Sequence, residues 1–513
     1  MLGSIWGEGW HRSALSHQIG RWFTGDAPFF TADLFSYPDP QRYWPADAGL
    51  QLIQVPGELL LGPGQGIGLS TLAMLGLAGW ATARLVRNLG ASLPAALVAG
   101  LVVETVPFVV VHLQAAVLEP AALGFMVLAG DQVQRAVRAP SWTSVGLAGG
   151  ATLLLAATSP YLAVYLALVC GFAFPFTWAW RQGWWRVALG CAVACMLALA
   201  PLLATGGGMP GRMDMERTAP PPPGASALGV DWTYQSQPLE RALSTVPGGI
   251  AVLLATGLGL SAARGRRWTA LGLVFFLGGP GVAQMLRAVG FRKLPPVSPL
   301  HELLIQLPVT NQLGNPVRLL APWIVLATVG AVLSADRRRG VLGVLGVVAV
   351  VELGFTAPLL ALPAAPVQAP ASVLSKVDGP LVVFPSGHDP FKNKDVGAKQ
   401  PHFYAGLTGQ PVGQGHGFEP STDHALQLAL HREAGFRVSP QAEAMVTPTT
   451  AYEVVLVLEG RMDPVKRDRI RRFLGRVGAE ERAQTDDMSL WWLPSIGLGG
   501  GSAEKDPLGA NEL

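Results

Sequence analysis

Acidic side chains gather near the beginning of the chain, among aromatic residues, prolines and glycines. The stretch from residue 5 to 56 contains Glu8, Asp26, Asp33, Asp39 and Asp47. A carboxylate in partly apolar surroundings can act as a general base for a hydroxyl nucleophile, and two carboxylates can hold a divalent ion over a phosphate. Acidic residues of an exposed loop are often only solvated, so both interpretations stay open.

Ionisable residues also interrupt the apolar part of the sequence. They lie within or at the ends of apolar segments: Glu58, Glu104, His112, Glu119 and Glu352. Charged groups at membrane depth are costly and mark a cavity or a pathway. Hydration at the membrane surface is the alternative for Glu104, His112 and Glu119, and pairing with a neighbouring helix is the alternative for Glu352.

A third candidate group lies where a long polar loop enters an apolar segment, at Asn311, Asn315 and Arg318. A guanidinium at the beginning of a helix can offer two parallel donors to phosphate oxygens. The alternative is an arginine that only extends its side chain toward lipid headgroups.

Metal and thiol chemistry are less well supported. Five of the nine histidines lie close together in the sequence, at His388, His402, His416, His424 and His431, without HxxxH or HExxH spacing. The spacing of Asp26, Asp33 and Asp39 matches no compact metal motif either. Because Cys170, Cys191 and Cys195 all lie in apolar segments, we interpret them as small apolar residues rather than as a disulfide framework.

The elements that position these residues are predicted to be membrane-spanning helices. Half of the 513 residues are hydrophobic, 14% are charged, and the mean hydropathy is +0.36, which is typical of an α-helical polytopic membrane protein. Segments of about 20 apolar residues can cross a bilayer. Ten such segments lie near residues 60–83, 91–111, 115–133, 143–160, 161–180, 186–204, 245–262, 268–288, 317–334 and 340–361.

The distribution of arginine predicts the orientation. Short basic connections follow every second apolar segment, at Arg84 and Arg87, Arg135 and Arg138, Arg181 and Arg186, Arg264 to Arg267, and Arg337 to Arg339. Since basic loops stay on the cytoplasmic side, residues 1–57 and those after about 362 are expected outside, with both termini extracytoplasmic.

The polar first stretch has no signal sequence ahead of it. We therefore expect a further apolar helix upstream, and the alternative is translocation of residues 1–57 by the first helix. Two long outward loops are expected at 205–244 and 291–316, the second with a short amphipathic helix at HELLIQL.

The chain divides into five parts: a first loop at 1–57, a transmembrane core at 58–362, a linker at 363–375, a small α/β domain at 376–496 and a disordered tail at 497–513. The α/β domain is predicted from the strands GPLVVFP, AYEVVLVLEG and SLWWLP and the helices TDHALQLALHREAG and DPVKRDRIRRFLGRVG. Asp463 before Pro464 is a good helix start.

Several stretches resemble a known group of proteins. The runs IWGEGW, GDAPFFTADLFSYPD and QVPGELLLGPGQG resemble the first outward loop of the GT-C superfamily of polytopic glycosyltransferases, and in particular its YfhO-like bacterial branch. The runs VVHLQAAVLEPAALGFMVLA and LIQLPVTNQLGNPVRLLAPWIVLATVGAVL are similar to later parts of that core. The run GPLVVFPSG, with QPHFYAGLTGQPVGQGHG, is similar to its outward domain.

This resemblance implies an enzyme of the bacterial inner membrane that moves a sugar from a polyprenyl-phosphate carrier to a glycan or lipid acceptor. It implies Asp33, Asp26 or, third, Glu8 as base or metal ligand, and Arg318 as the phosphate-binding residue. The resemblance also implies that His112 and Glu119 line the cavity, with Asn311 beside Arg318. The sequence lacks the family's first helix and the acidic residue after it, which leaves the identity of the base open.

A function of another class stays open as well. The chain fits a non-catalytic membrane component, such as a lipid or glycan transporter or an assembly scaffold, whose outward domain binds a partner. No cofactor is predicted besides a divalent metal ion as one alternative, and nothing favours nucleic acid as a partner.

Overall fold

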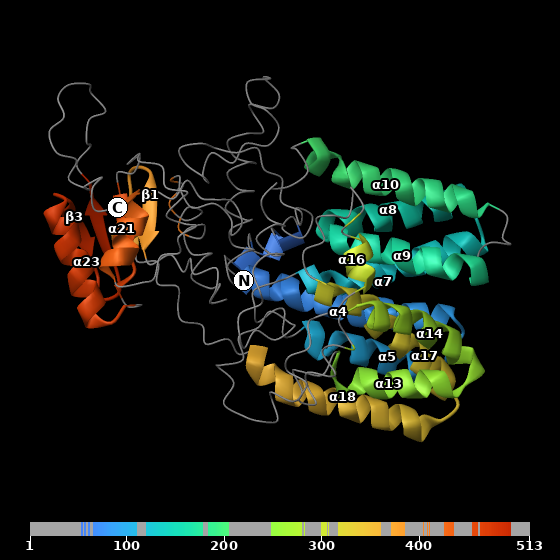
Figure 1. The fold of residues 1–513 in the computed structure, drawn as a ribbon. Helices are drawn as coiled ribbons and strands as arrows, with labels where there is room; N and C mark the ends of the chain where they lie inside the picture. The colour runs from blue at the N-terminus through green and yellow to red at the C-terminus, as the bar shows by residue number, and fades with distance from the viewer. Residues whose placement is uncertain are drawn as a thin grey trace. The chain divides into compact units, whose positions relative to one another are not determined.

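The computed structural model describes two compact units, one of helices and one of mixed helices and strands (Figure 1). The described residues are 65–109, 119–177, 183–204, 248–279, 299–304, 316–360, 371–384, 425–434, 454–459 and 462–493, with a few single positions elsewhere.

The helical unit follows the order of the apolar segments in the sequence. Its long elements are α4 (Gln65–Asn88), α5 (Leu93–Glu104), α7 (Leu123–Arg138), α8 (Trp142–Thr158), α9 (Pro160–Thr177), α10 (Trp184–Ala204), α13 (Gly249–Ser261), α14 (Ala263–Gly278), α17 (Leu320–Ala335) and α18 (Arg339–Leu360). Three short elements accompany them: η2 (Glu119–Ala122), η4 (Pro316–Leu319) and α16 (Pro299–Leu304). Each of the ten predicted segments thus overlaps one long helix.

Two of the predicted helices have wrong boundaries. The third helix begins at Leu123 rather than near 115, after the 3-10 turn that contains Pro120, and it continues to Arg138. The eighth begins at Ala263 rather than near 268, because its arginines are good helix formers although they are polar. The predicted short helix in the second long loop is present as α16, and Leu300 of this helix packs against Gly278.

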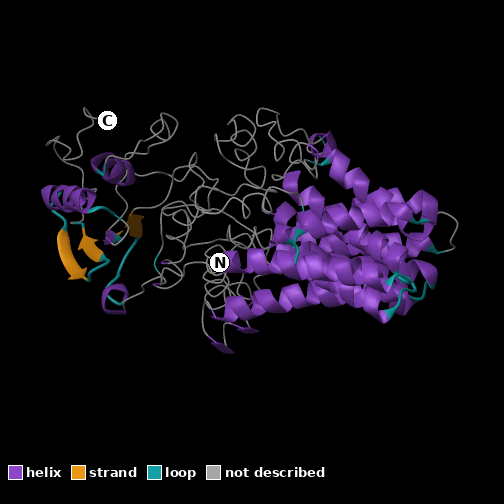
Figure 2. Ribbon diagram, turned by 90° about the horizontal axis from the view of Figure 1, so that it is seen from below, coloured by secondary structure: helices purple, strands orange, loops and turns teal. Residues whose placement is uncertain are grey.

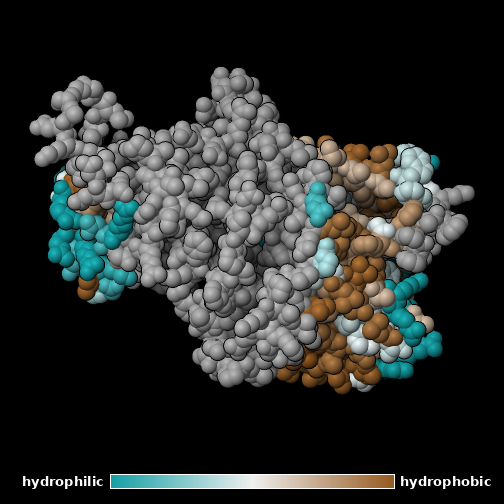
Figure 3. Space-filling view, viewed as in Figure 1, coloured by the Kyte–Doolittle hydropathy of each residue, from teal (hydrophilic) through white to brown (hydrophobic). Residues whose placement is uncertain are grey.

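The helical unit is strongly apolar, as the brown surface in Figure 3 shows. The stretch Gly68–Asn88 is long and apolar enough to cross a membrane by itself, and the shorter apolar helices are Leu93–Val109, Trp142–Thr158, Pro160–Phe174, Trp184–Ala198, Gly249–Ser261 and Leu320–Ala335. The number of ten membrane spans therefore stays a prediction.

Helix α17 lies at the centre of the packing, and almost every residue from Leu320 to Ala335 is buried. It can approach α14 closely because Gly265 and Gly330 face each other. A methyl group at Gly265 would overlap the carbonyl oxygen of Gly330 and the hydroxyl group of Ser334. Such contacts between small residues bring helix backbones together where no water drives association. The outer helices α10 and α18 instead expose apolar side chains such as Met196 and Val347.

Ion pairs join the arginine-bearing connections at one end of the bundle. The buried carboxylate of Asp131 lies 3.1 Å from Arg84 and 3.2 Å from Arg135, and it accepts a hydrogen bond from Asn88. Arg264, at the beginning of α14, donates to the carbonyl oxygens of Leu89 and Gly90.

Asp336 belongs to the same end of the bundle. It pairs with Arg264 at 3.5 Å and accepts from the backbone N–H of Ser92 at 2.8 Å. Arg138 donates to the carbonyl oxygen of Asn88. The connections α4–α5, α7–α8, α13–α14 and α17–α18 thus lie together, and this end of the bundle is called the arginine end below.

The second unit contains a four-stranded sheet, drawn in orange in Figure 2. Its strands are β1 (Leu381–Phe384), β2 (Val454–Val457), β3 (Glu480–Gln484) and β4 (Ser489–Trp492), in the order β1-β2-β4-β3. Strands β1 and β2 are parallel, whereas β4 is antiparallel to both β2 and β3. Two helices, α21 (Ala425–Glu433) and α23 (Pro464–Arg476), pack on the sheet face that carries Val382, Val455 and Trp491.

The predicted start of α23 is confirmed, because the side chain of Asp463 accepts from the backbone N–H of Lys466 at 2.9 Å. This hydrogen bond lowers the pKa of Asp463. Strand β3 was not predicted. Its sequence, EERAQ, is almost fully exposed and offers no alternation of apolar residues.

Candidate functional site

Two 3-10 turns and a helix break lie at the end of the bundle opposite the arginine end. The break is Ser159, between the end of α8 and the beginning of α9 at Pro160. Turn η2 adjoins α8, and turn η4 adjoins α9. Both turns precede a helix that runs toward the arginine end, so the polar residues in them are presented at this opposite end.

Arg318 is the predicted phosphate-binding residue, and the structure describes its side chain. Its guanidinium carbon lies 4.3 Å from the centroid of the Tyr161 ring, which belongs to the first turn of α9. Contact with an aromatic face fixes the plane of a guanidinium and leaves its donors in that plane. Tyr161 is itself 8% exposed, so its ring is a fixed support for Arg318.

The backbone around Arg318 is equally well anchored. Leu319 and Leu320, the next two residues, are fully buried, and Leu319 lies against Gly279 at the end of α14. The arginine therefore extends from a rigid support. Sequence reasoning did not include Tyr161, and the only signal for it was an aromatic residue directly after the Ser159–Pro160 break.

Glu352 is buried in α18 and binds the beginning of α13. Its carboxylate accepts the backbone N–H groups of Ile250 and, at 3.0 Å, of Ala251. The first N–H groups of a helix have no partner within the helix, and a carboxylate satisfies them well. Gly248 and Gly249 reach this geometry with φ of +68° and +87°. For Glu352 the structure therefore supports pairing with a neighbouring helix.

Glu104 is the second ionisable residue within the bundle that the structure places. It is the last residue of α5, and its carboxylate lies against Gly79 of α4, where a Cβ atom would come within 2.5 Å of it. The side chain is half-buried. Glycine at position 79 is therefore what leaves space for the glutamate.

Most of the other sequence-predicted site residues lie outside the described residues. They are Glu8, Asp26, Asp33, His112 and Asn311, as well as Glu58, Asn315, His388, His402, His416 and His424. Glu119 and His431 have a described backbone, in η2 and α21, but not a described side chain. The structure therefore brings the backbone of Glu119 and the side chain of Arg318 to the same end of the bundle, and the grouping of the others stays a prediction.

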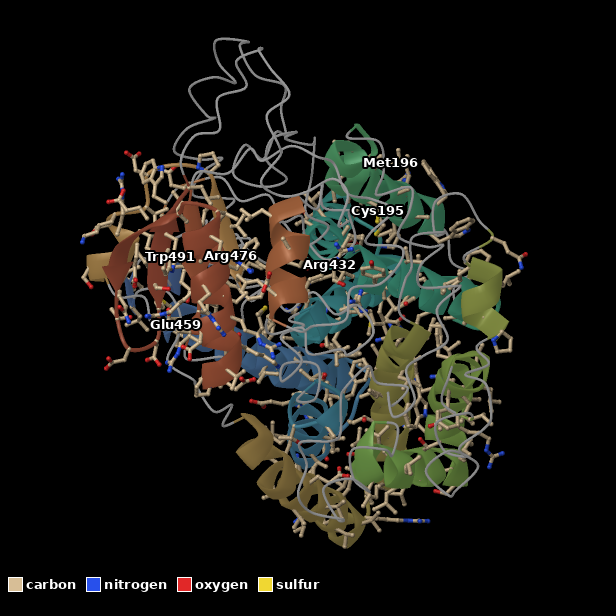
Figure 4. All side chains as sticks on the ribbon, turned by 60° about the vertical axis from the view of Figure 1, so that its left-hand side comes forward. Cys195, Met196, Arg432, Glu459, Arg476 and Trp491 are labelled. Carbon is tan, nitrogen blue, oxygen red and sulfur yellow. The ribbon has the colours of Figure 1, made fainter. Side chains whose placement is uncertain are left out.

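The α/β unit contains a buried polar network of its own, and Figure 4 labels two of its members, Glu459 and Trp491. Glu459, which directly follows β2 and is 1% exposed, accepts two hydrogen bonds from Arg471, at 2.8 and 2.7 Å. It also accepts from Ser489, whose hydroxyl oxygen accepts from the indole of Trp491. Every member has a partner, so this network stabilises the fold of the unit. Among the residues that the structure describes, no group of three His, Cys, Asp or Glu could hold a metal ion.

The cysteines agree with their interpretation as apolar residues. All three are free thiols in α9 and α10, and the hydroxyl group of Thr152 donates to the sulfur of Cys191 at 3.4 Å.

Comparisons with known proteins identify a similar fold. No protein-family model matches the chain, and no curated protein matches its sequence. Among solved structures, the chain is similar to the cryo-EM structure of the arabinofuranosyltransferase AftD from Mycobacteria, with a TM-score of 0.56 and 15% sequence identity.

The match covers 91% of this chain and 36% of AftD, so the chain spans about a third of the length of AftD. At this identity the likeness concerns the fold alone. It supports the predicted GT-C-like fold, and the narrower assignment to the YfhO-like branch stays a prediction.

Proposed function

We propose that the chain is a multi-pass membrane glycosyltransferase of the GT-C type, which transfers a sugar from a polyprenyl-phosphate-linked donor to a glycan or lipid acceptor. The observation that carries this proposal is the likeness of its fold to that of AftD over 91% of the chain. The reaction takes place at the outer face of the bacterial inner membrane, where residues 1–57 and those after 362 also lie.

The lengths of two helices support a recess on the outer side. Helix α5 has 12 residues and α13 has 13, which corresponds to about 18 and 20 Å at 1.5 Å per residue. The hydrocarbon layer of a membrane is about 30 Å thick. Both helices are shorter than this layer, although α5 is followed by a short helical stretch at residues 107–109.

Irregular backbone occurs at such a depth only where protein covers it or where it lines a water-filled cavity. Glu352 covers the end of α13 by binding its first N–H groups. We place the polar groups of the lipid-linked donor beside this end of α13.

Arg318 is the residue that we assign to the donor phosphate. Its in-plane N–H groups match phosphate oxygens, and the ring of Tyr161 fixes its orientation. We assign the cavity wall to His112, Glu119 and Asn311. Binding of the phosphate by a preorganised cation stabilises the negative charge that develops on the leaving group.

Asp33, Asp26 or Glu8 acts as the base. The carboxylate takes the proton of the acceptor hydroxyl group, the hydroxyl oxygen forms a bond with the anomeric carbon, and the bond from that carbon to the phosphate oxygen breaks. Polyprenyl phosphate leaves with the electron pair. A divalent ion held by two of these carboxylates would assist the departure of the phosphate.

The proposal is tested with purified protein, by measuring transfer of a labelled sugar from polyprenyl-phosphate donors to membrane lipid or glycan fractions. The name of AftD makes an arabinofuranosyl donor the first one to use. Arg318→Gln should lower the rate by about 100-fold, as loss of one charge-stabilising donor does. Arg318→Lys should retain part of the activity, because it keeps the charge but not the two parallel donors.

Three further variants complete the test. Arg266→Gln, which removes an exposed charge at the arginine end, should transfer at the wild-type rate. Asp33→Asn should abolish sugar transfer without loss of protein from the membrane. Tyr161→Phe should retain sugar transfer. Equal activity of Arg318→Gln and wild type would contradict the assignment of the phosphate site.

If the wild-type protein transfers no sugar from any donor, the non-catalytic function is favoured instead. In that case Asp33→Asn should leave growth unchanged, whereas deletion of residues 376–496 should not.

A further inference from the structure

A cluster of one arginine and two tryptophans lies at the arginine end of the bundle, far along the helices from Arg318. Arg186, in the first turn of α10, has its guanidinium carbon 5.6 Å from the ring centroid of Trp142 and 5.5 Å from that of Trp185. Trp142, the first residue of α8, is 77% exposed and Trp185 is 53% exposed. Neither ring is part of the core.

The packing of α8 against α10 brings these three side chains together. Gly190 leaves space for Val145, since a Cβ atom at position 190 would lie 2.9 Å from its side chain. Gly183 has a φ of +83°, and a Cβ atom at this position would lie 3.1 Å from the ring of Pro140. The first turns of the two helices are therefore fixed side by side, and the cluster is a built feature of the fold rather than a chance encounter of surface side chains.

Arg186 differs in its contacts from the arginines that stabilise the arginine end. Within the described ranges no carboxylate forms an ion pair with it. By contrast, Arg84 and Arg135 bind Asp131, and Arg264 binds Asp336. A guanidinium that contacts indole rings keeps its in-plane N–H donors for a bidentate acceptor. Indole rings prefer the headgroup layer of a membrane, where their N–H group meets polar atoms.

The excess of positive charge at the arginine end favours an anionic ligand for Arg186. Other exposed arginines lie in connections of the arginine end, at Arg87, Arg138, Arg266, Arg267, Arg337, Arg338 and Arg339. The carboxylates of the same end that the structure describes, Asp131 and Asp336, are already paired with arginines. An excess of basic residues at a membrane surface attracts anionic lipids by about 1 kcal/mol for each cation.

We propose that Arg186, Trp142 and Trp185 bind the phosphodiester headgroup of an anionic membrane phospholipid. Arg186 donates to two phosphate oxygens, and the two indole rings flank the glycerol part of the lipid. This site is separate from the donor site, and it depends on the helical unit lying in a membrane but not on the reaction.

The site is tested by native mass spectrometry of the full chain in detergent, titrated with phosphatidylglycerol and, separately, with zwitterionic phosphatidylcholine. Arg186→Gln should weaken the tightest phosphatidylglycerol binding by about five- to tenfold, the factor that corresponds to one cation at a membrane surface. Binding of phosphatidylcholine should not change. Trp142→Leu, a change at a side chain outside the core, should weaken phosphatidylglycerol binding in the same direction.

The matched control is Arg266→Gln, which removes the same charge from the same end of the bundle without an aromatic pair. It should bind phosphatidylglycerol as the wild type does. Equal weakening in Arg266→Gln would show diffuse attraction and overturn the proposal, as would unchanged binding in both Arg186→Gln and Trp142→Leu. Displacement of the lipid by millimolar inorganic phosphate would overturn it too, because the site would then take the free anion.

Discussion

Glu352 shows how a single carboxylate inside the bundle can serve the fold. It binds two N–H groups at the beginning of α13, and we predict that Glu352→Gln lowers the free energy of unfolding by about 1–3 kcal/mol, because one of the two acceptor atoms becomes a donor. Glu352→Ala should cost more, since both N–H groups lose their partner. Thermal unfolding of the purified protein in detergent measures both changes.

The control for this prediction is Val350→Ala in the same helix, a change at a side chain that is 52% exposed. It should stay within about 0.5 kcal/mol of the wild type. If Glu352→Gln unfolds at the wild-type temperature, its carboxylate does not stabilise α13, and a functional explanation for the residue regains weight.

Asp336 provides a prediction about pH. Burial alone raises the pKa of this carboxyl group, but the hydrogen bond from Ser92 and the positive charges of Arg264 and Arg337 outweigh it, so the pKa lies below its ordinary value. A carboxyl group whose pKa is lowered in the folded state stabilises that state above the pKa of the unfolded chain, about 3.9, and loses this effect as the pH falls below it. The difference in stability between wild type and Asp336→Asn should be constant near neutral pH and shrink below about pH 4.

Unfolding temperatures of both proteins between pH 7 and pH 3 measure this difference. Arg266→Gln is the control, because its guanidinium donates to a backbone carbonyl oxygen and pairs with no carboxylate of the described residues. Its difference from wild type should not change with pH. If the difference in stability between wild type and Asp336→Asn instead grows as the pH falls, the pKa of Asp336 is not lowered in the folded state.

At the scale of residues, the sequence predicted which side chains are unusual better than it predicted their partners. Glu352 was selected because ionisable groups are rare in apolar segments, and Arg318 because a guanidinium at the beginning of a helix can bind phosphate. Their partners, Tyr161 and the N–H groups of α13, lie far away in the chain. Such pairs depend on which helices become neighbours, and a single sequence carries no local signal for that.

At the scale of elements, close helix contacts depend on glycine. We predict that Gly265→Ala destabilises the helical unit by about 1–3 kcal/mol, the usual cost of forcing an extra methyl group into a packed core. The methyl group would overlap the backbone of Gly330, so α14 and α17 have to move apart. Thermal unfolding in detergent measures the loss.

Gly257→Ala in α13 is the matched control, because a Cβ atom there has no neighbour within 4 Å. It should raise stability by up to about 1 kcal/mol, since alanine is the better helix former. Equal effects of the two substitutions would argue against tight packing between α14 and α17.

Elements were predictable from sequence where apolar residues alone define them. Each of the ten long helices lies within a run of such residues, and the errors at α7 and α14 arose where polar residues continue a helix. Strand β3 had no such signal. In the sheet that the structure describes it is an edge strand paired with β4. Its charged residues face solvent, so pairing rather than its own composition makes it a strand.

At the scale of the whole molecule, the spacing of the arginines predicted that alternate connections lie together. Contacts between four of these connections confirm that they form one end of the bundle. Which side of a membrane this end faces depends on how the chain is inserted, and positive residues near a helix end normally stay in the cytoplasm. The same rule predicts that the α/β unit is outside the cytoplasm.

We therefore predict opposite accessibility for two engineered cysteines, one at the exposed Arg338 of the arginine end and one at the exposed Glu481 of β3. The three native cysteines are replaced by alanine in this experiment, so that only the new thiol reacts. In intact spheroplasts a membrane-impermeant maleimide should label Glu481→Cys and should label Arg338→Cys only after the membrane is permeabilised. Labelling of both positions from outside would show that the connections do not alternate, and labelling of Arg338→Cys alone would reverse the orientation. In the reversed case Arg318 and Tyr161 would face the cytoplasm, and a donor used at the outer face could not reach them.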